Sequence, residues 1–335
     1  MSVPLIVETS LDPMSRLRHH FTRPWEAAVQ ADQALRRNVV FSGPVSPELT
    51  LMPLRRGRGD PCFHVAADGS MWRTSLPPTG PVTARITRSA ADAVDVDAWG
   101  PGAAEFLDGA PALLGAFDDD AGFAPQEPTI ALAHRRVRDL RLGSTSRVLE
   151  ALIPAVLEQR VTGMDAFRAW RLLVTKFGTP APGPAPAHLR VPPGAQVWRR
   201  IPSWEFHRAN VDPRRARTVV LCAQRAESLE RLSAQPTEQA RAAMMSLPGV
   251  GEWTAAETAQ RAWGDPDALS VGDYHLAKTV GWSLLGHPID DPEMLELLEP
   301  MRPHRHRAVR LLLAGGMARN PRFGARLAIP RLAEL

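Results

Sequence analysis

Alternating apolar and polar positions predict β-structure in the first hundred or so residues. The segment CFHVAADGSMWRTS, residues 62–75, contains two short alternating runs joined by Asp68-Gly69, which is a strong β-hairpin signal. A further strand is predicted over PVTARITRS, residues 81–89. We therefore expect an antiparallel sheet with some helix around it in this part of the chain.

From about Ser144 the apolar positions change to helical spacing. The segment TSRVLEALIPAVLEQRV, residues 145–161, predicts one helix, and GMDAFRAWRLLVTKFG, residues 163–178, predicts a second that stops at Gly178. The proline-rich residues 179–194 are expected to form a surface loop.

The helical pattern restarts at DPRRARTVVLCAQRAESLERL, where Asp212 is expected to cap the helix and Pro213 to be its first residue. The sequence as a whole predicts an α+β fold. Residues 1–115 are expected to form an N-terminal domain with an antiparallel sheet, and residues 116–335 a helical region.

Composition narrows the class of protein. The chain has 335 residues, enough for two or three domains, and a net charge of +4. It has two cysteines, Cys62 and Cys222, which suit a reducing compartment and exclude a four-cysteine zinc or iron–sulfur site. Neither a membrane-spanning segment nor a signal peptide is recognised, so we expect a cytoplasmic protein.

Arginine is concentrated near the end of the chain. Clustered arginine suggests a polyanionic partner, although a solvated arginine-rich surface explains it equally well. The arginines concerned are Arg302, Arg305, Arg307, Arg310, Arg319, Arg322, Arg326 and Arg331.

A glycine turn, Leu247-Pro-Gly-Val-Gly251, separates two segments of helical composition. Its glycines permit positive φ and allow another backbone to approach closely. The second helix is expected to begin at about Glu252, and the free N–H groups of its first turn form an anion site that suits a phosphate. An ordinary helix–helix connection would show the same five residues.

The residues that follow this turn make it more specific. Leu-Pro-Gly-Val-Gly, then Trp253-Thr254-Ala255, then an isolated aspartate at Asp273, resembles the helix-hairpin-helix DNA glycosylases, especially the 3-methyladenine DNA glycosylase II type. ALIPAVLEQRVTG resembles that family's helix that enters DNA, and NVDPRRARTV the segment before the hairpin. The resemblance covers about residues 40–320. It implies two helical subdomains, with the hairpin at 236–264, and an N-terminal antiparallel β-sheet domain.

The resemblance also implies a partner, double-stranded DNA with damaged bases, which are flipped out for the reaction. Arg160 would fill the gap left in the base stack, although a plain phosphate contact is an alternative for it. A structural Na⁺ or K⁺ would be held by the backbone carbonyls of Met245, Leu247 and Val250, with no other cofactor and no iron–sulfur cluster. The residues implied to contact DNA are Gln159, Arg160, Gly249, Val250, Gly251, Trp253 and Thr254.

Asp273 is the catalytic residue that the resemblance implies. A carboxylate there would stabilise the positive charge that develops on the sugar, and would position or deprotonate the attacking water. An aspartate after Gly272 is also a good helix cap, and the two roles can coexist. A strand-cutting relative would carry a lysine at Trp253, whereas the only lysines here are Lys176 and Lys278, so we expect a monofunctional enzyme.

The base pocket is expected to involve Trp253, Glu257 and Tyr274. Glu257 and Leu313 stand where the family has aromatic residues that sandwich the base. Glu257 could attract a cationic base as a carboxylate, donate a hydrogen bond if burial protonates it, or lie on the surface. His275 is interpreted as a packed, hydrogen-bonded histidine.

Two functions remain open at this stage. The first is a DNA glycosylase for alkylated purines that leaves an abasic site and acts as a cytoplasmic, nucleoid-associated monomer without contact to membranes. The alternative is a non-catalytic helix-hairpin-helix protein that recognises damaged or bent DNA. The intact Asp273 at family spacing favours the enzyme.

Overall fold

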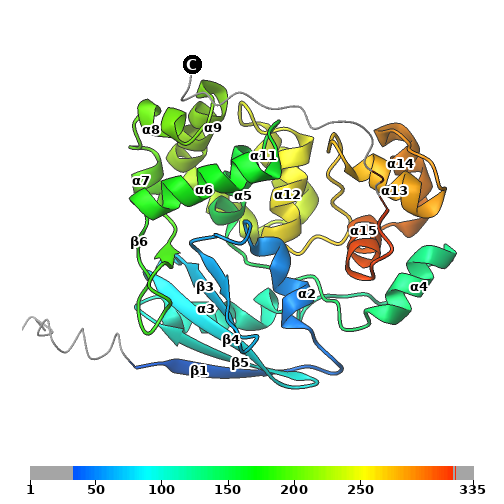
Figure 1. Ribbon diagram of the computed structural model, residues 1–335, viewed down its shortest axis with the longest axis horizontal. Helices are drawn as coiled ribbons and strands as arrows, with labels where there is room; N and C mark the ends of the chain where they lie inside the picture. The colour runs from blue at the N-terminus through cyan, green and yellow to red at the C-terminus, as the bar shows by residue number, and fades with distance from the viewer. Residues whose placement is uncertain (1–32, 320, 322–335) are drawn as a thin grey trace, which may run out of the picture.

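The computed structural model describes residues 33–319 and 321. Its N-terminal part is a five-stranded antiparallel sheet in the order β1-β5-β4-β3-β2 (Figure 1). The predicted hairpin is present as β2 and β3, and the strand predicted at 81–89 as β4. The strands are β1 (Leu35–Val40), β2 (Phe63–Val65), β3 (Met71–Ser75), β4 (Val82–Ala90) and β5 (Ala93–Trp99).

One face of this sheet packs against helix α3 (Ala103–Leu113). Alternate residues of β4, namely Val82, Ala84 and Ile86, are completely buried and share a hydrophobic core with Leu107 of α3. The period of two along a strand gives one face to this core. A short helix α2 (Pro47–Leu51) and the 3₁₀ helix η2 (Met52–Leu54) complete this part.

The remainder is helical. The first predicted helix is present but shorter, Val148–Leu157 within the expected 145–161, and the second, Gly163–Phe177, stops before Gly178 as predicted. Asp212 accepts from the N–H groups of Arg214 and Arg215 and so caps α9, as expected. The helices are α4 (Pro128–Arg136), α5 (Val148–Leu157), α6 (Gly163–Phe177), α7 (Ala195–Trp198), α8 (Ser203–Arg208), α9 (Pro213–Gln224), α10 (Ala226–Arg231), η3 (Leu232–Ala234), α11 (Thr237–Met245), α12 (Glu252–Ala262), α13 (Leu276–Leu284), α14 (Asp291–Leu298), η4 (Glu299–Met301) and α15 (Arg305–Ala314).

The proline-rich segment is more ordered than a plain surface loop. Its ends pair as two short strands, β6 (Thr179–Pro180) and β7 (Arg190–Val191), and Leu189 and Val191 are buried. Gly183 lies against the side chain of Trp99 at the end of β5, and Pro182 lies against Gly100, the next residue. This segment therefore connects the helical part to the sheet.

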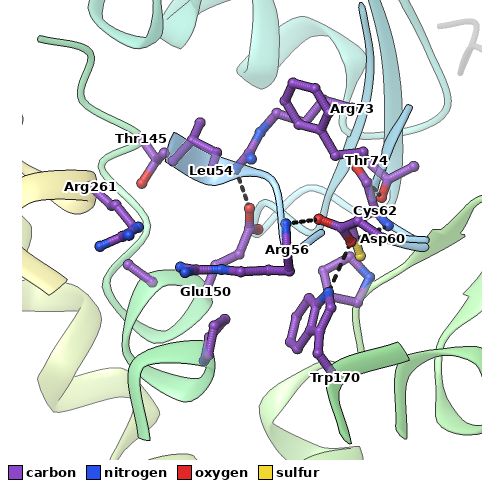
Figure 2. Close-up of a pocket in the computed structure, with 14 residues that line it drawn as sticks. Leu54, Arg56, Asp60, Cys62, Arg73, Thr74, Thr145, Glu150, Trp170 and Arg261 are labelled. Atoms are coloured by element: carbon purple, nitrogen blue, oxygen red, sulfur yellow. Dashed lines mark hydrogen bonds and ion pairs between the residues drawn. The ribbon is translucent and has the colours of Figure 1, made fainter. Parts of the chain in front are cut away.

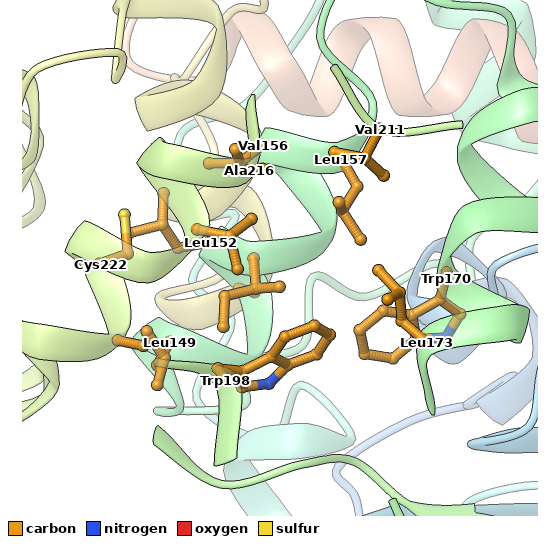
Figure 3. Close-up of a cluster of buried hydrophobic side chains, with 14 of the residues drawn as sticks. Leu149, Leu152, Val156, Leu157, Trp170, Leu173, Trp198, Val211, Ala216 and Cys222 are labelled. Atoms are coloured by element: carbon orange, nitrogen blue, oxygen red, sulfur yellow. The ribbon is translucent and has the colours of Figure 1, made fainter. Parts of the chain in front are cut away.

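Two hydrophobic cores organise the helices. The first surrounds α5, in which every residue except Glu150 is buried, and it includes the stacked rings of Trp170 and Trp198 (Figure 3). The second joins α4, α13, α14 and α15, on the right of Figure 1. The fold is therefore α+β with two helical subdomains and an N-terminal antiparallel sheet, which confirms the predicted class.

Buried polar contacts connect the sheet to the first helical core (Figure 2). The carboxylate of Asp60 accepts from the backbone N–H groups of Arg56 and Cys62 at 2.6 and 2.9 Å, and from Trp170 Nε1 at 2.9 Å. Burial raises the pKa of Asp60 despite these bonds. Arg73 of β3 forms an ion pair of 2.5 Å with Glu150 of α5. The junction is therefore held by directed polar groups as well as by apolar packing.

The arginines of residues 301–319 mostly have internal partners. Arg305 pairs with Asp267 at 2.6 Å, and Arg307 pairs with Asp118 at 2.5 Å. Both arginines are buried, so the arginine density in this segment serves the fold and is not by itself a sign of a polyanionic partner. Arg322, Arg326 and Arg331 lie outside the described residues. No helix in the described part of the chain is long and apolar enough to span a membrane.

Candidate active site

The glycine turn joins α11 and α12, and its two glycines differ in their surroundings. Gly249 has φ +90°, and a Cβ atom there would overlap the side chain of Thr218 on α9. Gly251 is extended, with φ −104° and ψ −177°, and no atom lies within 4 Å of the place a Cβ would take. Packing therefore requires Gly249, whereas Gly251 leaves open space at the start of α12.

That open space faces the first turn of α12. The N–H of Ala255 donates to Gly251 O at 2.9 Å, so the preceding N–H groups of the helix have no acceptor within it. The N–H groups of this first turn are therefore available to an anion, and the phosphate site expected near Gly249, Gly251 and Thr254 stays a prediction.

The carbonyl groups of the turn suit a monovalent cation by their chemistry. Leu247 O accepts one hydrogen bond, from Val250 N at 3.0 Å, while Met245 O and Val250 O accept none from the described residues. Uncharged oxygen donors of this kind match hard cations. No cluster of three or more His, Cys, Asp or Glu residues in the described chain could hold another metal.

The end of α5 lies against the turn. Gln159 Nε2 donates to Gly249 O at 2.9 Å and to Thr254 Oγ1 at 2.8 Å. Its amide therefore fastens α5 to the hairpin. The next residue, Arg160, is exposed and has φ +55°. Gln159 and Arg160 are both predicted to contact DNA at this end of α5, and of the two it is Arg160 whose side chain is exposed to solvent.

Asp273 lies between the hairpin and α13 and uses both carboxylate oxygens. Oδ1 accepts from His275 N at 2.8 Å and Leu276 N at 2.9 Å, at the start of α13. Oδ2 accepts from Trp253 Nε1 of the hairpin at 3.2 Å. Asp273 is thus a helix cap, and it also lines a cavity; the catalytic role expected for it stays a prediction.

The cavity beside Asp273 has a volume of about 280 Å³ and lies where all three parts of the fold meet. Glu257 and Leu313 both line it, but Trp253 and Tyr274 do not. Tyr274 is 76% exposed, with Lys278 Nζ 4.3 Å from its ring centre, so it lies outside this cavity, unlike the pocket position expected for it. No Phe, Trp or Tyr of the described chain lines the cavity. Its polar lining residues include Thr50, Arg141, Gln260, Arg261, Ser270, His275, Thr279, His306 and Arg310.

Glu257 is a buried carboxylate. Its side chain is 14% exposed, pairs with Arg261 at 2.7 Å and accepts from Ser270 Oγ at 2.5 Å. Burial alone would raise the pKa of Glu257, but the charge of Arg261 and the hydrogen bonds from Ser270 and Arg261 lower it overall. The alternative of a surface glutamate is therefore excluded, and the lowered pKa favours the carboxylate over the protonated donor.

Two cavity arginines have no carboxylate partner in the described chain. Arg310 Nη2 donates to Leu49 O at 2.8 Å, and burial followed by the charge of Arg261 lowers the pKa of Arg310 to about 10. It is still a cation at neutral pH. Arg141 lies with its guanidinium 5.1 Å from the ring centre of Phe41, and its buried Nε has no hydrogen-bond acceptor. The cavity therefore presents two positive groups that no acid compensates.

Of the cavity residues on α15, the sequence analysis singles out Leu313 for the pocket but not His306, Val309 or Arg310. His306 and Arg310 are four residues apart and so share one helix face, which was the available signal. The N-terminal wall, Thr50, Pro53 and Leu54, carries no local signal at all.

Solved structures of DNA glycosylases share this fold. The 3-methyladenine DNA glycosylase from Archaeoglobus fulgidus aligns with a TM-score of 0.69 and 16% identity over 84% of this chain and 98% of its own. The 8-oxoguanine glycosylase/lyase of Clostridium acetobutylicum aligns with a TM-score of 0.63 and 12% identity over 85% and 99%. MBOgg1 in complex with a low-affinity DNA ligand aligns with a TM-score of 0.66 and 14% identity, over 85% of this chain and 96% of its own.

These neighbours are helix-hairpin-helix DNA glycosylases, which confirms the predicted resemblance at the level of the fold. No protein-family model matches the sequence, and no curated protein matches it.

The two glycines give a matched test of the turn. Gly249→Ala should lower the free energy of unfolding by more than about 1 kcal/mol, because a side chain is strained at positive φ and would overlap Thr218. Gly251→Ala should change stability by less than about 0.5 kcal/mol. Urea denaturation of both variants measures this, and equal losses would contradict the assignment.

Gly251→Val should leave the fold intact and weaken duplex binding, because a side chain would obstruct the approach of a phosphate to the turn. Binding should also be independent of sequence and should weaken steeply with salt. The affinity for an abasic-analogue duplex is to be measured at two salt concentrations. If neither salt nor the substitution matters, the turn is only a connection.

His306 should make stability depend on pH. Burial, followed by the charges of Arg310, Arg261 and Arg307, lowers the pKa of His306 well below 6.5. The unfolded chain therefore binds a proton below about pH 6.5 that the folded chain does not, and stability falls with pH by up to about 1.4 kcal/mol per unit. His306→Gln should reduce the loss between about pH 7.5 and 5.5. A variant that loses as much as the wild type would contradict this.

Proposed function

We propose that the chain is a monofunctional DNA N-glycosylase that hydrolyses the N-glycosidic bond of a flipped, damaged base and leaves an abasic site. The observation that carries this proposal is the position of Asp273, a fixed carboxylate at a cavity of about 280 Å³ next to the open start of α12. The shared fold supports it. We expect the protein to act as a monomer on DNA in the cytoplasm.

In this proposal the hairpin binds the DNA backbone. The N–H groups at Gly251, Trp253 and Thr254 hold a phosphate, which positions the enzyme without reading sequence. A Na⁺ or K⁺ at the carbonyls of Met245, Leu247 and Val250 would add positive charge close to that phosphate. Arg160, exposed next to the hairpin, fills the space that the flipped nucleotide leaves.

Asp273 then acts on the sugar. Its negative charge stabilises the oxocarbenium-like state that forms as the bond to the base breaks, and it orients the water that attacks the sugar. The hydrogen bond from Trp253 Nε1 and the two N–H groups of α13 hold the carboxylate in one orientation, so it needs no rearrangement during the reaction.

A lyase step through a lysine amine is not part of the proposal. Lys176 is engaged with Glu205 at 2.6 Å, and Lys278 lies over the ring of Tyr274 outside the cavity. Trp253 occupies the hairpin position that a reactive lysine would need. The DNA strand should therefore remain uncut.

We propose alkylated purines of the 3-methyladenine type as substrates. Alkylation at N3 or N7 gives the base a positive charge, so it leaves without needing a proton. One carboxylate such as Asp273 then suffices, and the ionised Glu257 inside the cavity favours a cationic ring.

A second candidate is an uncharged base that carries carbonyl oxygens. Arg141 and Arg310 favour it, because uncompensated guanidinium groups repel a cation and donate to acceptors. Glu257 is largely compensated by Arg261, which weakens its attraction for a cationic ring. The two candidates differ in the charge of the base while it is attached to the sugar, and they release different bases, so a single product assay separates them.

Asp273→Asn should reduce base release by about 10²-fold or more, because the carboxylate charge that stabilises the positive sugar is lost. The amide oxygen can still accept from the N–H groups of α13, so the fold and duplex affinity should be retained. Asp290→Asn, which alters the N-terminal cap of the neighbouring helix α14, is the matched control and should release bases normally. Single-turnover rates at saturating enzyme measure both. Near-wild-type release by Asp273→Asn would refute the catalytic role.

Liquid chromatography of bases freed from dimethyl-sulfate-treated duplex should show 3-methyladenine or 7-methylguanine. The strand should stay intact until heat or alkali breaks it, and borohydride should trap no covalent protein–DNA adduct. A matched uracil- or hypoxanthine-containing duplex tests the second candidate. Release of these bases alone would replace the alkylpurine proposal, efficient trapping would refute the monofunctional one, and duplex binding with no release from any substrate would favour the non-catalytic alternative.

A further inference from the structure

The C-terminal end of α5 is held by three different parts of the protein. Leu157 O accepts from Nη1 of Arg215 on α9 at 2.6 Å. Glu158, the next residue, pairs with Nη1 of Arg56 at 2.6 Å. Gln159 then donates to the hairpin. Three consecutive residues are therefore each fixed by a separate element immediately before the exposed Arg160.

Arg56 brings the N-terminal part into this arrangement. It lies in the loop between η2 and β2, and its backbone N–H is held by Asp60. The side chain of Arg56 is 6% exposed and that of Glu158 is 17% exposed. A buried ion pair is weak evidence for stability, since apolar residues of similar size commonly stabilise as well, but it fixes a geometry. The pair joins residues 102 positions apart in the chain.

The backbone conformation of Arg160 is explained by the contacts that hold the three residues before it. Its φ of +55° is unusual for a residue with a side chain and is maintained only where the surroundings determine it. We propose that Arg56 is a positioning residue for DNA binding: by holding Glu158, it keeps the exposed Arg160 in the orientation that enters the duplex. This inference rests on the proposed function for its partner, DNA.

The segment around Arg56 holds the cavity as well. Pro53 O accepts from Nε of Arg261 at 3.2 Å, and Leu49 O accepts from Nη2 of Arg310 at 2.8 Å. Residues 47–60 thus contact the α5 tip and two cavity arginines. The sheet is the part of the protein that carries this segment, which gives the N-terminal part a role in presenting the site to DNA.

A double-mutant cycle tests the proposal. Arg160→Ala should weaken binding to a duplex with a stable abasic analogue by about tenfold, a loss typical of a desolvated contact. In the Arg56→Met background the same change should cost at most about threefold, because Arg160 is already misplaced. The two arginines share no hydrogen bond, so the coupling would act through Glu158 and the turn. Fluorescence of a 2-aminopurine next to the abasic analogue should report the same loss of ordering in both single variants.

Three further variants keep the result interpretable. Arg36→Met removes an ion pair with Asp97 at the far edge of the same sheet and should change neither affinity nor the effect of Arg160→Ala. Arg56→Lys should recover part of the coupling, because one donor of Arg56 contacts Glu158. If Arg56→Met alone fails to fold, Arg56→Met/Glu158→Leu removes both charges, and we expect it to fold while affinity stays low.

The proposal is overturned if Arg160→Ala costs the same factor in both backgrounds, or if it has no effect in the wild-type background. Binding measures the cycle, and base release is assayed separately. Coupling without release of any base would contradict the glycosylase proposal alone, whereas release without coupling would contradict the role of Arg56 alone.

Discussion

The burial of α5 constrains everything around it. Nine of its ten residues are buried, so the polar groups at its C-terminal end cannot be satisfied by water alone. Partners must come from neighbouring elements, and the structure supplies Arg215, Arg56 and the hairpin for three successive residues. The requirement to satisfy one helix end thus brings the sheet, α9 and the glycine turn to the same point.

The cavity follows from the same meeting of parts. It lies between units that have separate hydrophobic cores, and its wall combines apolar residues such as Leu54, Leu269 and Val309 with polar and charged side chains. These side chains satisfy one another only in part. Glu257 and Arg261 are paired, whereas Arg310 binds a backbone carbonyl and Arg141 lies over a ring. An excess of positive charge therefore faces the space that is proposed to hold the base.

The sequence predicts what depends on local pattern. The hairpin turn, the helix boundaries near Val148, Gly163 and Asp212, and the carboxylate at Asp273 are all encoded within short segments. The helix-hairpin-helix resemblance extends this to the fold class because the spacing of turn, helix and acid is itself local.

What the sequence does not predict depends on how deeply side chains are buried and which partners they meet. The pKa of Glu257 depends on the balance between burial and its contacts with Arg261 and Ser270, and burial alone gives the opposite direction. Tyr274 follows Asp273 directly, yet the start of α13 turns it to the surface. Arginine density in 301–319 suggests a charged surface, but Arg305 and Arg307 find acids at Asp267 and Asp118 that no local pattern connects to them.

Asp273 shows why a structural and a chemical role need not compete. A carboxylate has two oxygens, and here Oδ1 serves the helix while Oδ2 is shared with Trp253. Capping removes the rotational freedom that an unattached side chain would have, so in the proposed reaction the negative charge would stay in one place as the sugar becomes positive. Trp253, at the hairpin position where the resemblance implies a lysine in strand-cutting relatives, adds to this restraint. One residue, Trp253, thus leaves this position without an amine and also holds the carboxylate of Asp273.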